Sequence, residues 1–215
     1  MIVSHRHRYV FVHIPKTGGT SLTLALEQRL GRDDIGLSDT PKGLNRRRRA
    51  RDVPARGRLW KHSTLADAEG LVDPAIYAEY LIFTLVRNPW ARAVSLHGWL
   101  RQQRFDHPSV ALAKQLAFRE FLHHPLTRSQ LSRPYRDALT ASAGEVSGLY
   151  LRLEHLDADL PALEAHLGFS LRPLPHENRS GSGDWRAAYD DDSAALMAGL
   201  AAEEIARFGY RFDAD

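Results

Sequence analysis

The sequence contains no cysteine among its 215 residues. Disulfide bridges and thiolate metal sites are therefore excluded. No apolar run approaches the roughly 18 to 20 residues that a helix needs to cross a bilayer, and the N-terminus lacks the pattern of a cleavable signal peptide. We therefore expect a cytoplasmic protein without a membrane span, and the many alanines and arginines against few lysines favour a bacterial source.

Several catalytic signatures are also missing. A Walker P-loop has a lysine after its last glycine, followed by a Ser or Thr that holds magnesium, and this chain has no such sequence. Neither the GxSxG turn of many hydrolases nor the HExxH metal motif is present. The pairs His5/His7 and His123/His124 have no carboxylate partner at helical spacing. We therefore expect neither a hydrolase nor a metal site.

A chain of 215 residues is long enough for one domain with a sizeable core. No repeat or linker divides it, so we expect a single domain over 1–215. The net charge of +3 hides an asymmetry: residues 1–136 carry 23 basic and 11 acidic side chains, whereas residues 137–215 carry 6 and 15. The basic part favours an anionic ligand.

The densest basic block lies between residues 46 and 58. A solvated mobile loop, a surface for an acidic acceptor and a nucleic-acid contact are three possible interpretations. No aromatic side chain interleaves with the block to stack on bases, so we favour the loop and expect no nucleic-acid partner. The block consists of Arg46 to Arg49, Arg51, Arg56 and Arg58.

The most informative segment is HIPKTGGTS at 13–21. An apolar, β-branched and aromatic run at 9–14 precedes it and predicts a buried strand. Leucines at helical spacing in 21–30 predict a helix that ends at Gly31. A strand, a glycine loop with a lysine and a helix form the geometry that binds a phosphate.

Each residue type in this loop suits an anion. Gly18 and Gly19 let backbone N–H groups turn toward the ligand, and the helix start adds donors and a partial positive charge. Lys16 adds a full charge, while hydroxyl donors come from Thr17, Thr20 and Ser21. The alternative is a tight turn in which the glycines serve only the backbone and Thr20 or Ser21 caps the helix.

A second apolar run, at 80–86, predicts another buried parallel strand and is followed by RNPWARAVS. Pro89 suits the first turn of a helix. Arg87 then lies at the carboxyl end of a strand, where open α/β sheets bind their ligands. Arg87 and Ser95 can converge on a second anionic group. The alternative is that Arg87 pairs with a carboxylate and Ser95 is a surface hydroxyl.

The remaining pattern predicts an alternation of strands and helices. A third strand is expected at 148–153, and 173–183 is expected to be a loop because of its Pro, Gly and Ser content. Acidic residues at 190–192 favour a helix start there. The predicted helices lie at 65–71, 89–103, 110–122, around Pro161 to Gly168, and 192–207.

The two loop segments, HIPKTGGTS and FTLVRNPWARAVS, together closely resemble the nucleotide-binding signature of the sulfotransferases. The branch they resemble most contains the carbohydrate sulfotransferases and their bacterial relatives. The resemblance implies an α/β fold, a P-loop-like three-layer sandwich with a central parallel sheet flanked by helices. Further stretches with the same likeness are KHST at 61–64, YLRLEHL at 150–156, LPHENRS at 174–180 and EEIARFGY at 203–210.

Enzymes of this family use 3′-phosphoadenosine-5′-phosphosulfate (PAPS), so the resemblance implies PAPS as donor, without a metal ion. It implies that the loop from Lys16 to Ser21 holds the 5′-phosphosulfate and that Arg87 and Ser95 hold the 3′-phosphate. Arg179 and Arg152 are further candidates for the cofactor cleft, although both can equally be ion-paired structural residues. The implied acceptor is a small molecule or glycan, such as a carbohydrate or glycolipid.

Sulfuryl transfer needs a group that stabilises the leaving phosphate and a base for the acceptor hydroxyl. Lys16 is the candidate for the first role. His62 is the candidate base because KHS at 61–63 matches the base-bearing stretch of the family. Lys61 beside it can hold the sulfate or lower the His62 pKa. The competing histidines are His13, His97 and His176.

Two other classes stay open at this point. A small-molecule kinase of related fold is disfavoured by the missing Walker lysine and magnesium ligand. A non-catalytic nucleotide-binding module would retain Lys16, Arg87 and Ser95 without turnover. The oligomeric state cannot be predicted from these patterns.

Overall fold

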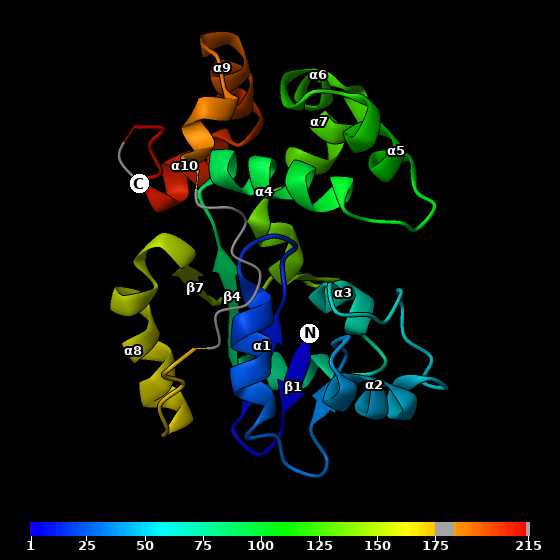
Figure 1. The fold of residues 1–215 in the computed structure, drawn as a ribbon. Helices are drawn as coiled ribbons and strands as arrows, with labels where there is room; N and C mark the ends of the chain where they lie inside the picture. The colour runs from blue at the N-terminus through cyan, green and yellow to red at the C-terminus, as the bar shows by residue number, and fades with distance from the viewer. Residues whose placement is uncertain (175–182, 214–215) are drawn as a thin grey trace. The chain divides into compact units, whose positions relative to one another are not determined.

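A computed structural model describes residues 1–174 and 183–213 of the chain (Figure 1). The chain forms two compact units. The first contains Met1–Val86 and Tyr135–Glu177, and the second contains Arg87–Pro134 and Asn178–Asp215.

The first unit is built on a five-stranded sheet with the order β3-β1-β2-β4-β7. β2 runs parallel to β4, with Val12 opposite Thr84, and β4 runs parallel to β7. β1 is antiparallel to both of its neighbours. The carboxyl ends of β2, β4 and β7 therefore lie along one edge of the sheet. The strands are β1 (Ile2–Ser4), β2 (Tyr9–Val12), β3 (Ile35–Gly36), β4 (Leu81–Val86) and β7 (Leu149–Arg152).

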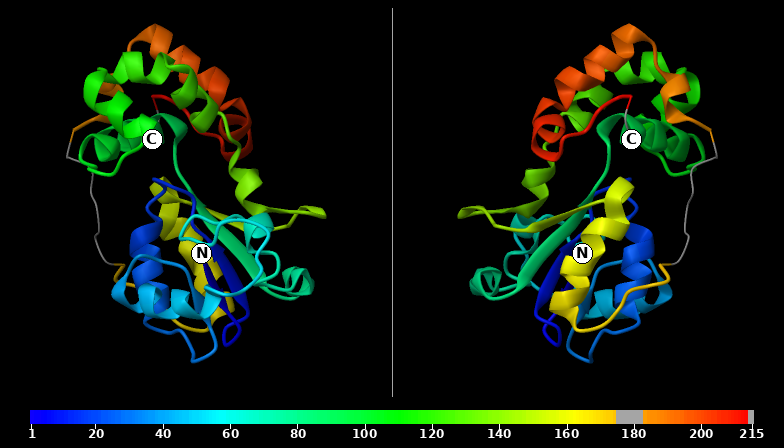
Figure 2. Two further views of the ribbon diagram at one scale, coloured as in Figure 1. Left: turned by 90° about the vertical axis from the view of Figure 1, so that its right-hand side faces the viewer. Right: turned by 90° about the vertical axis from the view of Figure 1, so that its left-hand side faces the viewer.

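Both faces of this sheet are covered, because its strands are apolar on both sides. Tyr9 and Phe11 point to one face, where α1 (Gly19–Glu27) and α8 (Leu156–Leu167) pack side by side (Figures 1 and 2). Val10 and Val12 alternate to the other face and pack with α3 (Leu65–Ala68) and with loop residues. The predicted three-layer α/β arrangement is confirmed.

Shorter elements complete the first unit. α2 (Pro41–Arg47) begins at Thr40, whose hydroxyl accepts from the Gly43 N–H, and continues into a 3₁₀ turn. The other elements are the 3₁₀ turns Arg48–Ala50, Pro74–Ala78, Tyr135–Leu139 and Leu153–His155, and the hairpin of β5 (Thr140–Ala141) and β6 (Gly144–Glu145).

The second unit is helical in its described part. Asn88 caps α4 (Pro89–Arg101), because its side-chain oxygen accepts from the N–H groups of Trp90 and Ala91. The Trp90 indole donates to the Ala194 carbonyl in α9. The other elements are α5 (Pro108–Gln115), α6 (Phe118–His123), α7 (Pro125–Leu131), the 3₁₀ turn Trp185–Ala188, α9 (Asp191–Leu200) and α10 (Ala202–Phe208).

The structure corrects two predicted helices. The helix expected over 110–122 is two helices, because Leu116 is extended with ψ 140° and the Glu120 carboxylate then accepts from the Ala117 N–H to begin a new one. The helix expected over 192–207 is likewise broken at Ala201. Helical periodicity continues across both breaks, so it does not show them.

Two further expectations need a correction in part. The sheet is mostly parallel, as expected, but residues 2–4 form an antiparallel strand between β3 and β2. That run of three residues is too short to stand out as a strand. The basic block is not entirely a loop, since 41–50 is helical. Arg46 and Arg47 donate to the backbone carbonyls of residues 34, 37 and 38, and these bonds hold the helix in place.

Candidate functional site

The loop between β2 and α1 has a backbone conformation suited to an anion. Lys16 and Gly18 are both left-handed, with φ of +69° and +84°. Left-handed residues in such loops turn neighbouring N–H groups toward one concave side. Thr17 is completely buried, and its hydroxyl donates to the Ile14 carbonyl at 2.9 Å. That hydroxyl therefore stabilises the loop itself, and the backbone N–H of Thr17 is the group that would contact a ligand.

The N-terminus of α1 has no side-chain cap. Gly18 is the N-cap residue and makes no side-chain cap bond, and the first turn contains no acidic residue. The alternative in which Thr20 or Ser21 caps the helix is therefore wrong. The N–H groups and the positive end of the helix dipole are not neutralised by a protein carboxylate in that turn. Thr20 is exposed and Ser21 is half-buried.

Both glycines of the loop also have packing reasons. A Cβ on Gly19 would lie 2.4 Å from Cδ2 of His13, and one on Gly18 would lie 2.7 Å from a methyl of Leu153. Gly18 has in addition the positive φ that side-chain-bearing residues rarely adopt. Gly19 therefore lets the imidazole of His13, and Gly18 the side chain of Leu153, pack directly on the start of the helix.

His62 is in contact with this loop. Its Nδ1 lies 2.7 Å from the His13 carbonyl, and the two imidazole rings meet edge to face with centroids 4.6 Å apart. A carbonyl can only accept, so Nδ1 carries the proton and Nε2 of the neutral ring has the lone pair. Burial lowers the pKa of His62 to about 4, so the ring is neutral at pH 7. The geometry gives His62 the form that a general base requires.

His13 has a different environment. Its ring is buried, stacks on Phe11 and lies against the start of α1. Burial holds its pKa well below the usual value. His97 also packs in the interior, where its ring contacts Phe118 and Phe121 and its Nε2 donates to the Leu116 carbonyl. Both histidines therefore have the packed surroundings of structural residues.

Arg152 ends β7 and is paired with Asp159 of α8. Its Nε and Nη2 donate to the two carboxylate oxygens at 2.9 and 2.7 Å, and its backbone N–H donates to the same group at 2.8 Å. These bonds hold the pKa of Asp159 below its usual value. The structure therefore favours the ion-paired role of Arg152, which joins a strand end to a helix start.

Arg87 and Ser95 belong to the second unit. Arg87 directly follows β4 and is half-buried, and Ser95 is buried on α4 with 7% of its surface exposed. Asn88, which the sequence analysis did not single out, caps the N-terminus of α4, the helix that begins just after Arg87 and contains Ser95. The predicted Arg179, like His176 in the same stretch, lies outside the described residues.

Within residues 1–174 and 183–213, no cluster of three or more His, Asp or Glu side chains has the arrangement of a metal site. No helix in the same ranges is long and apolar enough to span a membrane.

The chain was compared with known families, curated proteins and solved structures. The model of the sulfotransferase family matches residues 1–169. A search of curated proteins gave no match. Among solved structures, the chain is similar to that of mouse sulfotransferase SULT7A1 complexed with PAP, with a TM-score of 0.47 and 16% identity over 94% of this chain and 85% of that chain.

Proposed function

Because this chain belongs to the sulfotransferase family, we propose that it transfers a sulfuryl group from PAPS to a hydroxyl of an acceptor, a carbohydrate or glycolipid. The observation that carries the proposal is the contact of a neutral histidine, His62, with a lysine-bearing anion loop. One sulfotransferase domain over 1–215 is part of this proposal, and the family match over residues 1–169 includes segments of both compact units.

The donor would be held by charge and by backbone donors. Lys16 and the N–H groups of residues 17–21 would surround the 5′-phosphosulfate, with no carboxylate in the first turn of α1 to repel it. The exposed Thr20 and half-buried Ser21 would add hydroxyl donors. Arg87 and Ser95 are proposed for the 3′-phosphate. Arg179 stays a prediction, and Arg152 is left out because Asp159 pairs with it.

PAPS supplies the sulfuryl group, whose sulfur–oxygen bond to the phosphate breaks as the acceptor oxygen attacks sulfur. Nε2 of His62 would take the proton of the acceptor hydroxyl. Lys16 would stabilise the negative charge that develops on the departing phosphate oxygen. The His13 carbonyl holds one proton of His62 on Nδ1, so that Nε2 of the neutral ring carries the lone pair before transfer. In this proposal His62 is the base, and Lys16 is the cation that stabilises the leaving group.

A pKa of about 4 makes His62 a weak base in the free protein. An anionic donor in the adjacent loop would favour the protonated ring and raise that pKa. We therefore expect PAP, the product nucleotide, to raise the His62 pKa. The pH titration of the His62 ring by NMR, with and without PAP, measures this.

The first experiment is a calorimetric titration with PAP beside 5′-AMP and ATP, all without metal. Tight binding that depends on the 3′-phosphate supports the donor site and justifies an acceptor screen with radiolabelled PAPS. Binding of ATP alone, with turnover that requires magnesium, would instead favour a kinase.

The second experiment separates catalysis from binding. His62→Ala is expected to lower transfer about 10²- to 10⁴-fold, the range of a general base, while PAP affinity stays the same. His5→Ala, an exposed histidine of the same unit, is the matched control. Normal transfer by His62→Ala would show that His62 is not the base.

A further inference from the structure

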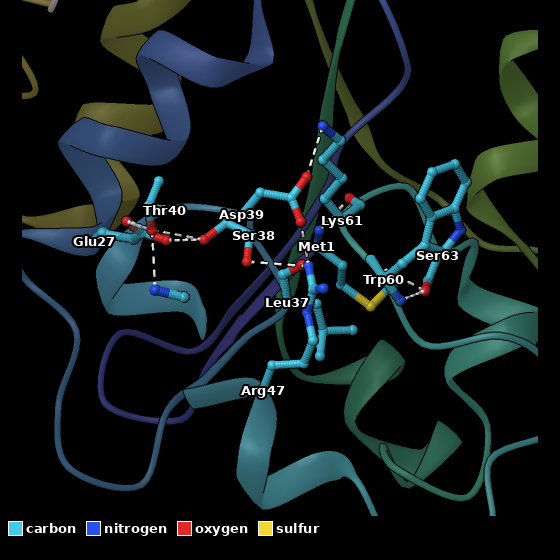
Figure 3. Close-up of polar contacts among 11 residues, drawn as sticks. Met1, Glu27, Leu37, Ser38, Asp39, Thr40, Arg47, Trp60, Lys61 and Ser63 are labelled. Carbon is cyan, nitrogen blue, oxygen red and sulfur yellow. Dashed lines mark hydrogen bonds and ion pairs between the residues drawn. The ribbon is translucent and has the colours of Figure 1, made fainter. Parts of the chain in front are cut away.

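Asp39 pairs with two cations, Arg47 of α2 and Lys61 of the segment that contains His62 (Figure 3). One carboxylate oxygen accepts from Nη2 of Arg47 at 2.6 Å, and the other pairs with Nζ of Lys61 at 2.8 Å. The two cations hold the pKa of Asp39 below its usual value. Asp39 and Lys61 are 22 positions apart in sequence, and Lys61 immediately precedes His62.

We propose that Asp39 is a positioning residue for sulfuryl transfer, which holds Lys61 and thereby places His62 against the anion loop. This inference rests on the proposed function. It assigns to Asp39 a role that acts through Lys61 and His62, without contact with the reacting atoms.

The chain on either side of Asp39 is fixed to the end of α1. The hydroxyls of Ser38 and Thr40 both donate to the carboxylate of Glu27, which is only 3% exposed. The Lys42 ammonium donates to the Glu27 carbonyl. A Cβ on Gly43 would overlap the Ser38 hydroxyl at 1.8 Å, so the packing here is tight. The carboxylate of Asp39 therefore extends from a rigid support.

The segment around His62 is held at several points. Ser63 is completely buried, accepts from the Trp60 N–H at 2.9 Å and donates to the Arg58 carbonyl at 2.9 Å. His62 bonds to the His13 carbonyl. Lys61 connects this segment to residues 38–40 through its ion pair with Asp39. Loss of the Asp39 carboxylate would remove the ion pair with Lys61 and leave the hydrogen bonds of His62 and Ser63 in place.

The same carboxylate affects the charge around His62. The titratable groups that act on this ring are His13, which contacts it directly, and at longer range the charges of Lys61, the Met1 amino group and Asp39. Asp39 alone in this set is anionic, and it favours the protonated ring, whereas Lys61 and the amino group oppose protonation. An uncharged side chain at 39 would therefore lower the basicity of His62 further and also leave the Lys61 charge uncompensated beside it.

The size of the effect is limited by solvent, because the side chains of Asp39 and Lys61 are 52% and 32% exposed. We expect Asp39→Asn to lower kcat about fivefold, the upper end for a partly exposed ion pair, with KM for PAPS changed less than about twofold. The NMR titration of His62 should move to lower pH. Asp39→Glu should restore both toward the wild-type values.

The matched control is Asp33→Asn, an exposed aspartate of the same unit. It should leave the His62 titration and kcat unchanged. Lys61→Gln combined with Asp39→Asn should be no worse than the more affected single variant, because each single variant already removes the ion pair between Asp39 and Lys61. Thermal unfolding of each variant separates a positioning effect from loss of the fold.

Either of two results overturns the inference. One is an Asp39→Asn variant whose His62 titration and kcat equal those of Asp33→Asn. The other is an Asp39→Glu variant that is folded but restores neither quantity. If the wild-type protein transfers no sulfate from PAPS, the proposed function fails, and the NMR titration still decides whether Asp39 acts on His62.

Discussion

The two ends of α1 differ in how their backbone groups are satisfied. At the N-terminus, Gly18 makes no side-chain cap bond and no acidic residue lies in the first turn. At the C-terminal end, the buried Glu27 accepts from two hydroxyls, and Lys42 donates to its carbonyl. A carboxylate there opposes the helix dipole, and these donors offset that cost. The C-terminal end is thus bonded by side chains of the protein, whereas the N-terminal end has neither a side-chain cap nor a carboxylate in its first turn.

The largest effect is expected at the N-terminal end. Lys16→Ala should lower transfer from PAPS about 10²- to 10³-fold, as the loss of one preorganised donor to a developing anion does. Radiolabelled transfer and PAP titration measure the effect. Lys42→Ala is the matched control at the C-terminal end, and it should keep PAP affinity and lose stability instead.

A second variant at the same position separates strain from function. Lys16 has φ +69°, so any side chain there is strained. Lys16→Gly should lose transfer as Lys16→Ala does, yet be more stable than Lys16→Ala by about 1 kcal/mol. Equal stability of the two variants in urea unfolding would show that the loop is not strained at this residue.

A pH dependence of stability follows from the histidine beside the N-terminal end. The folded pKa of His62 is about 4, whereas the unfolded value is near 6.5. The unfolded chain therefore binds a proton first, and stability falls as the pH decreases from about 6.5 to 4, by up to ~3 kcal/mol. Urea unfolding across this range should show the decrease, and His62→Asn should make it smaller. An unchanged slope in that variant would contradict the depressed pKa.

At the C-terminal end the expected effect is on stability and not on ligand binding. Glu27→Gln removes the charge that accepts from Ser38 and Thr40, and it should lower the free energy of unfolding by about 1–3 kcal/mol. PAP affinity should stay within about twofold of the wild-type value. If PAP binding falls as far as in Lys16→Ala, the two ends of α1 are not independent.

Local sequence pattern was sufficient for the loop at the N-terminal end. The apolar run of β2, the lysine and glycines, and the leucines of α1 are contiguous, so their conformation follows from short-range chemistry. The strand at 81–86 and the helix start at Pro89 were predictable for the same reason. The breaks at Leu116 and Ala201 were not, because periodic side chains continue through them.

The surroundings of His62 were beyond the reach of local pattern. Its partner is a backbone carbonyl 49 residues away, and the carboxylate that pairs with Lys61 is 22 residues away. A carbonyl has no sequence signal, and a lone aspartate in a polar stretch has none either. Arg152 illustrates the same limit, since a cation at a strand end can bind a ligand or pair with a carboxylate such as Asp159.

The α/β pattern, the loop with its lysine and glycines, and the family resemblance could be read from the sequence, because each depends on residues that are neighbours along the chain. The folded structure was needed to show that the Thr17 hydroxyl bonds within the loop, that His62 is neutral with its proton on Nδ1, and that Asp39 pairs with Lys61. These features depend on burial and on partners brought together by the sheet. Burial sets the ionisation of a side chain, and neither the burial nor the distant partners can be read from the sequence.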